Sequence, residues 1–141
     1  MEISEVRNRL RQAMDRAKRQ AADRRARADA AATAFDTFLN HTAIPLLRQI
    51  ANVLRAEGYL FSVSTPSGSV RLMSDTSSEN FLEILLDTAA DPPRIVAHVS
   101  RSRGRRVIDA ERLVASGAPD AITEEELFAF LLKELEPFVE R

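Results

Sequence analysis

The sequence predicts an α+β fold: a long N-terminal helix kinked near Pro45, a small, mostly antiparallel sheet of 4–5 strands, and a C-terminal helix. Three observations support this prediction. Residues 3–40 contain no Gly or Pro and consist mostly of strong helix formers. Residues 59–109 contain short runs of alternating apolar and polar side chains, separated by turn residues. Apolar residues return at helical spacing after residue 123.

The first helix is predicted to project. At 1.5 Å per residue, about 38 helical residues reach about 57 Å, which is longer than a domain of this size is wide. We therefore divide the chain into a projecting helix or coiled-coil arm over residues 1–40 and a compact α+β domain over residues 41–141.

Small and apolar residues follow the first helix at steps of three and four, in a heptad-like seam that Arg24 interrupts. Between residues 13 and 34 the seam is nearly all alanine, which buries little area against a core but lets two helices approach closely. We predict that the seam binds a partner through Leu10, Met14, Ala17, Ala21, Ala28 and Ala31.

A second helix is predicted over residues 44–57. Asn40 or Thr42 is expected to cap its start, Pro45 fits its first turn, and Gly58 ends it. From residue 35 onward the apolar side chains become bulky, which predicts the segment that covers the sheet. These bulky residues are Phe35, Phe38, Leu39, Ile44, Leu46, Leu47, Ile50, Val53 and Leu54.

Five strands are predicted next, over residues 59–65, 70–74, 81–87, 94–100 and 105–109. The third strand is apolar on both faces in places, so we expect it to be central. Turns are expected at residues 66–68, 91–93 and 101–104, and a connecting loop at residues 110–121.

The last helix begins with a capping box, in which Thr123 precedes Glu126 by three residues. It is expected to end near Pro137. Its predicted buried face consists of Leu127, Phe128, Phe130, Leu131, Leu132 and Leu135.

Composition favours an interaction protein. The chain has 141 residues, 45% apolar and 29% charged, as in folded proteins, and its formal charge is −1. Residues 1–30 carry nine basic and five acidic side chains, a net of +4, so the remaining 111 residues sum to −5. This asymmetry is more typical of an interaction arm than of a catalytic domain. With no signal-peptide-like or membrane-spanning apolar run, we expect a soluble, cytoplasmic protein without a membrane partner.

No motif predicts catalysis. There is no Gly-rich phosphate loop, nucleophile elbow or paired histidine spacing, and the absence of cysteine excludes disulfides and thiolate zinc sites. We predict no catalytic residue, metal ligand or cofactor. An enzyme would have to use Asp87, His98 or the carboxylates of residues 75–91. His98 could form a carboxylate–imidazole pair with Asp87 or Glu83 on a neighbouring strand, but the favoured interpretation is a surface histidine at the rim of the sheet.

A second basic feature follows the fourth strand, where Arg101, Arg103, Arg105 and Arg106 gather. They either grip phosphate or an acidic partner, or form a solvated hairpin tip that discourages edge pairing. The arginines of residues 7–27 are equally ambiguous, because they are mixed with acids and have no aromatic neighbour.

The function predicted from the sequence is therefore a non-enzymatic protein–protein interaction module. Its N-terminal helix would pair with a second copy, as a homodimer, or with the helix of a partner protein. The alternative is a nucleic-acid-binding protein that uses the N-terminal arginines and the 101–106 loop, although the pI near 6.1 counts against it.

Overall fold

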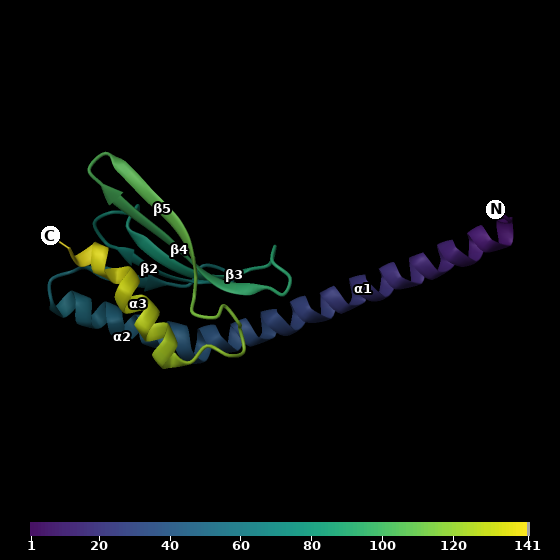
Figure 1. Ribbon diagram of the computed structural model, residues 1–141. Coiled ribbons are helices and arrows are strands. Elements are labelled where there is room, and N and C mark those ends of the chain that lie inside the picture. Colours follow the sequence, from purple (N-terminus) through teal and green to yellow (C-terminus); the bar gives the residue numbers. More distant parts are fainter. Residues whose placement is uncertain (141) are drawn as a thin grey trace.

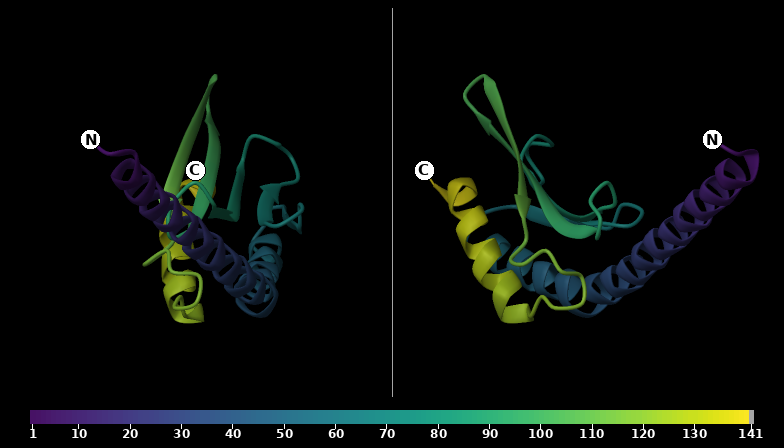
Figure 2. Two further views of the ribbon diagram at one scale, coloured as in Figure 1. Left: turned by 90° about the vertical axis from the view of Figure 1, so that its right-hand side faces the viewer. Right: turned by 45° about the vertical axis from the view of Figure 1, so that its right-hand side comes forward.

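The computed structural model describes residues 1–140 and has the predicted α+β architecture (Figure 1). Helix α1 (Ile3–Phe38) continues through a π-helical turn (Leu39–Ala43) into α2 (Ile44–Ala56). An antiparallel sheet follows, and α3 (Glu124–Val139) closes the fold. Both α2 and α3 lie on one face of the sheet, whereas no helix within residues 1–140 covers the other face (Figures 1 and 2).

The sheet is a simple meander of the strands β1 (Phe61–Ser64), β2 (Val70–Ser74), β3 (Phe81–Asp87), β4 (Arg94–Arg103) and β5 (Arg106–Leu113). As predicted, β3 is the central strand. Its Ile84 lies opposite Val70 of β2 and Ala97 of β4, so these three side chains share the face that packs on the helices.

The junction between α1 and α2 differs from the prediction. No side chain caps the start of α2 in the described chain, and Asn40 instead donates its side-chain N–H to the carbonyl of Asp36 (2.9 Å). The Ile44 N–H donates to the Leu39 carbonyl five residues back, in the π-helical pattern. This wider turn accommodates Pro45 without ending the helix, so the helical segment bends here but is not interrupted (Figure 2).

The core lies between the sheet and the helices. Within Ile3–Phe38, all of which the structure describes, Phe35 and Phe38 are the buried side chains. The core therefore starts at the C-terminal end of α1. The largest fully buried side chains beyond it are Leu47, Val70, Leu72, Leu82, Ile84, Ile95, Val114, Leu127 and Leu131.

Two element boundaries were predicted too short. Strands β4 and β5 pair to the end of a two-residue turn, with Arg103 opposite Arg106. Gly104 has the positive φ (63°) that such a tight turn requires, so Arg101 and Arg103 lie in β4 and not in a four-residue tip. Residues 110–113 also belong to β5 and not to the connecting loop.

Helix α3 runs through Pro137 instead of stopping there. The ring removes one backbone donor from the last turn. Phe138 packs edge-on against Phe61 of β1, with ring centroids 6.0 Å apart, and this contact holds the last turn on the sheet.

The capping box at the start of α3 is formed as predicted. The Thr123 hydroxyl accepts from the Glu126 N–H (3.1 Å), and the Glu126 carboxylate accepts from the Thr123 N–H (3.2 Å). Replacing Thr123 by Ala should lower the free energy of unfolding by about 1 kcal/mol, measured by urea denaturation. The control is Thr33→Ala, an exposed site within α1 where alanine should be neutral or stabilising. Equal losses in both variants would contradict the capping role.

Candidate interaction surfaces

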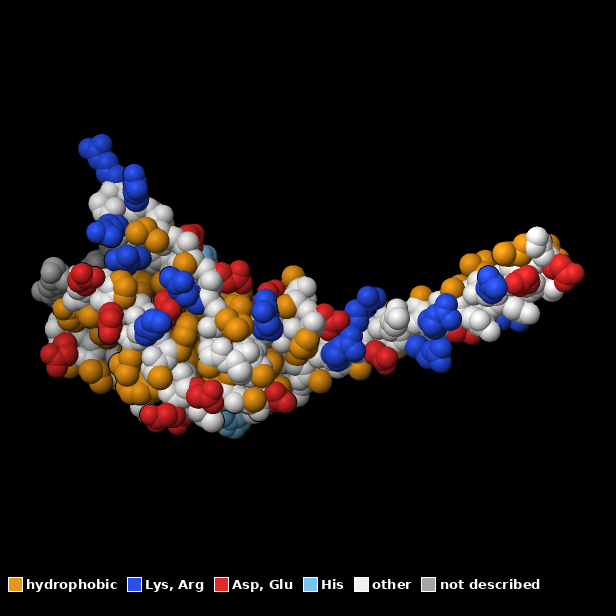
Figure 3. Space-filling view, viewed as in Figure 1, with side chains coloured by type: hydrophobic (Ala, Val, Ile, Leu, Met, Phe, Trp, Pro, Cys, Tyr) orange, Lys and Arg blue, Asp and Glu red, His pale blue; other side chains and the backbone are white. Residues whose placement is uncertain are grey.

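An apolar stripe is exposed along the N-terminal part of α1. We define the N-terminal stripe as Ile3, Val6, Leu10 and Met14, whose residues are 78%, 43%, 59% and 52% exposed. Their spacing of three, four and four residues places them on one side of the helix. This part of α1 extends away from the rest of the molecule (Figures 1 and 2), and hydrophobic side chains gather along one of its edges (Figure 3).

The predicted partner-binding seam divides between this projecting part and the domain. Leu10 and Met14 belong to the N-terminal stripe, and the alanines at 17 and 28 are exposed, whereas Ala21 is half-buried. Ala31 is also half-buried and lines a cavity of about 340 Å³ with Pro92, Pro93 and the loop at residues 116–120. Ala31 therefore faces the compact domain.

A bidentate ion pair anchors α1 to the sheet. The Arg27 guanidinium donates to both carboxylate oxygens of Asp91, each at 2.9 Å, in the turn between β3 and β4. Hydrogen bonding from Arg27 holds the pKa of Asp91 below its usual value, so the pair is intact at neutral pH and is lost as the pH falls through that lowered pKa. It sets the boundary beyond which α1 projects.

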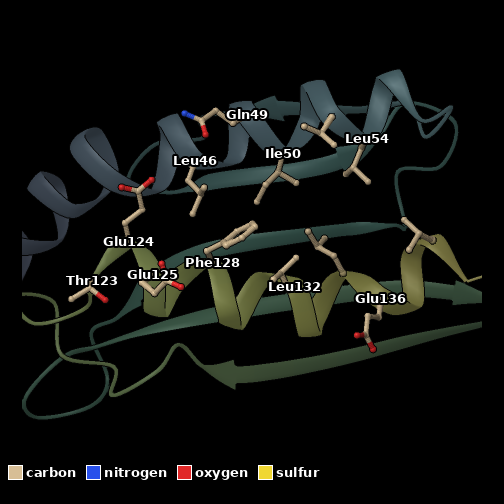
Figure 4. A pocket seen from close by; sticks show the side chains of 13 residues that line it. Leu46, Gln49, Ile50, Leu54, Thr123, Glu124, Glu125, Phe128, Leu132 and Glu136 are labelled. Atoms are coloured by element: carbon tan, nitrogen blue, oxygen red, sulfur yellow. The ribbon is translucent and has the colours of Figure 1, made fainter.

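A groove lies between α2 and α3, with the strands behind it (Figure 4). Its volume is about 1080 Å³. Leu46, Ile50 and Leu54 of α2 face Phe128 and Leu132 of α3 across it. The charged side chains that line it in the described chain are all acidic, namely Glu124, Glu125 and Glu136.

The groove corrects three sequence predictions. Val53, Phe128 and Leu132 were expected to be buried, but they line this groove and are 63%, 38% and 54% exposed. Phe128 and Leu132 each follow a fully buried leucine by one residue, which turns them 100° away from the core. The signal was present in the sequence, because apolar residues at positions 127, 128, 130, 131, 132 and 135 occupy more of the helix circumference than one sheet-facing stripe requires.

The four arginines at residues 101–106 belong to the β4–β5 hairpin. Arg101 is half-buried, whereas Arg103, Arg105 and Arg106 are exposed, and basic side chains crowd the free end of the β4–β5 hairpin (Figure 3). Within residues 1–140, none of the four forms an ion pair or a side-chain hydrogen bond. The hairpin end therefore presents uncompensated positive charge.

His98 lies on the uncovered sheet face, where its carboxylate partner is neither of the two that the sequence suggested. His98 pairs with Asp109 of β5, and not with Asp87 or Glu83. Glu83 lies opposite His98, but it accepts from Arg71 of β2 at 2.6 Å. Arg71 on the neighbouring strand therefore pairs with Glu83 in place of His98. Ser100, the next residue of β4 on this face, donates its hydroxyl to the Glu79 carbonyl at 2.7 Å.

Comparisons with known proteins add no family. No family model, curated protein or solved structure matches this chain. In residues 1–140 no group of three His, Asp or Glu side chains is placed to hold a metal ion, and none of the described helices is long and apolar enough to span a membrane. Function is therefore inferred from three exposed surfaces: the N-terminal stripe, the α2–α3 groove and the hairpin arginines.

Proposed function

We propose that the protein is a non-enzymatic protein–protein interaction module that self-associates through the N-terminal part of α1. The observation that supports this is the exposed N-terminal stripe on a helix that projects from the domain. A helix without tertiary contacts is marginal in water, and fully burying an aliphatic side chain contributes about 1.5–3 kcal/mol. A second copy of the chain supplies such burial, and two-fold dimers are the commonest assemblies.

A charge placed in the stripe should weaken association. The Leu10→Glu substitution loses the burial of one leucine at each contact between two copies. Each lost contact should raise the dissociation constant of the dimer about tenfold to a hundredfold, measured by sedimentation equilibrium. The matched control is Gln12→Glu, which adds the same charge two residues, or 200°, around the helix. Equal weakening by both substitutions would point to net charge and not to the stripe.

Nucleic-acid binding is the second candidate, supported by the arginines at the end of the β4–β5 hairpin, which have no ionic partner among residues 1–140. Arginine binds phosphate through two parallel hydrogen bonds, and each neutralised phosphate of duplex DNA adds about 0.9 to the slope of log affinity against log salt.

This candidate predicts a specific salt dependence. Replacing Arg101, Arg103, Arg105 and Arg106 by Gln should reduce the slope by up to about 3.6, measured by fluorescence anisotropy with a duplex oligonucleotide at several salt concentrations. The control Arg48→Gln changes an exposed arginine of α2 and should leave the slope unchanged. A slope that the four substitutions do not alter would exclude the hairpin as the DNA contact.

A further inference from the structure

We infer that the groove between α2 and α3 binds residues 3–19 of a second copy, which we call the docking segment. This inference rests on the proposed self-association and identifies the surface that the N-terminal stripe meets. Three properties of the two surfaces support it: their apolar character, their length and their charge.

Both surfaces expose large apolar side chains to water. The groove leaves Val53 on its α2 wall and Phe128 and Leu132 on its α3 wall exposed to water, although all three are large and apolar. The N-terminal stripe is exposed in the same way. An amphipathic helix that lays its apolar face into an apolar groove buries both at once, with anchors at helical spacing.

The lengths also agree. The N-terminal stripe spans 11 residue steps from Ile3 to Met14, which is about 17 Å of helix. The groove walls are the 13 residues of α2 and the 16 residues of α3, about 20 Å and 24 Å long. The stripe therefore fits within the groove from end to end.

Charge selects the docking segment as the occupant. This segment carries six basic and two acidic side chains, a net of +4. On the helical wheel Arg7 and Arg11 lie on one side of the stripe, and Arg9 and Arg16 on the other. The groove offers Glu124 and Glu125 near the start of α3 and Glu136 near its end. An apolar stripe flanked by arginines thus meets an apolar groove whose α3 wall carries three acidic side chains.

The donor of the segment must be another molecule. The helix α1 runs away from the groove of its own chain and is continuous with one groove wall, α2 (Figure 1). Direct pairing of two docking segments is less favourable, because it would bring two segments of net charge +4 together and leave both grooves open. Two copies that exchange docking segments form a closed dimer with two identical contacts.

Complementation between two full-length variants tests this arrangement. Leu10→Glu damages the docking segment and leaves the groove intact, whereas Leu132→Glu damages the groove and leaves the segment intact. The control Ala129→Glu adds the same charge at an exposed position of α3 that does not line the groove. The mass of each variant, and of an equimolar mixture of Leu10→Glu and Leu132→Glu, is measured by light scattering on nuclease-treated protein.

We expect the wild type and Ala129→Glu to associate and each of the two other variants to have the monomer mass of 15.7 kDa. Their mixture should recover association, because one intact segment meets one intact groove. If Leu132→Glu has the wild-type mass while Leu10→Glu is monomeric, the groove inference is wrong and self-association through α1 stands. If the wild type is itself monomeric, the proposed function fails as well.

A second groove variant keeps the test valid if Leu132→Glu does not fold. Val53→Glu places the charge on the α2 wall, at a position that is exposed in the single chain. Circular dichroism melting identifies any variant that has lost its fold. A folded Val53→Glu protein that associates as the wild type does would overturn the inference, and a folded monomer that Leu10→Glu rescues would support it.

Discussion

Deletion of residues 2–22 should abolish the proposed self-association, leaving a monomer whose compact domain is folded. The deleted part of α1 contains the whole N-terminal stripe and no buried residue. What remains keeps the Arg27–Asp91 ion pair and the helix end at Phe35 that enters the core. Because the stripe is the proposed contact, its removal abolishes association completely. Light scattering measures the mass, and thermal unfolding measures the domain.

A full-length control separates the stripe from the length of the helix. Replacing Ile3, Val6, Leu10 and Met14 together by Ala retains every charge of α1 and favours the helix. This variant should be as monomeric as the truncated protein. A truncated protein that remains dimeric would place the contact in the compact domain and refute the proposed role of α1.

The second large effect concerns the centre of the sheet. Ile84 in β3 is fully buried, between the neighbouring strands and beneath the helices. Ile84→Ala should lower the free energy of unfolding by about 2–5 kcal/mol, because it removes buried methyl groups and leaves a cavity. That is a large part of the 5–15 kcal/mol typical of a domain. Urea denaturation of the truncated monomer measures it without interference from association.

The same substitution at the sheet edge is the control. Ile108 lies in β5 and is 40% exposed. Ile108→Ala should therefore cost less than about 1 kcal/mol. Similar losses at both positions would mean that the core does not lie between β3 and the helices.

The features predicted correctly from the sequence depend on local patterns. The length of α1, the Thr123–Glu126 capping box and the central position of β3 each follow from neighbouring residues or from one apolar run. Of the candidate surfaces, the sequence analysis named Leu10 and Met14 of the N-terminal stripe and the hairpin arginines, because spacing and charge are visible in one dimension. Their role in binding stays a prediction.

The features that were missed depend on contacts between distant segments. The groove exists because α2 and α3 share one face of the sheet, which turns Val53 and Leu132 to the outside. His98 pairs with Asp109 because Arg71, three strands away along the meander from β5, already binds Glu83. The register of the strands, and the competition between Arg71 and His98 for Glu83, can be worked out only when the order of the strands is known. The π-helical turn likewise reflects packing that helix propensity does not encode.

The π-helical turn at Leu39–Ala43 joins the long helix α1 to the short helix α2, which is held in the core by Leu47. From this turn to Ile3 the helix is about 54 Å long, so a rotation of only 10° at the turn would displace its tip by about 9 Å. The Arg27–Asp91 ion pair lies between the turn and the tip and opposes such a rotation. The direction of the projecting end is therefore set by two features near the sheet, the turn and this ion pair.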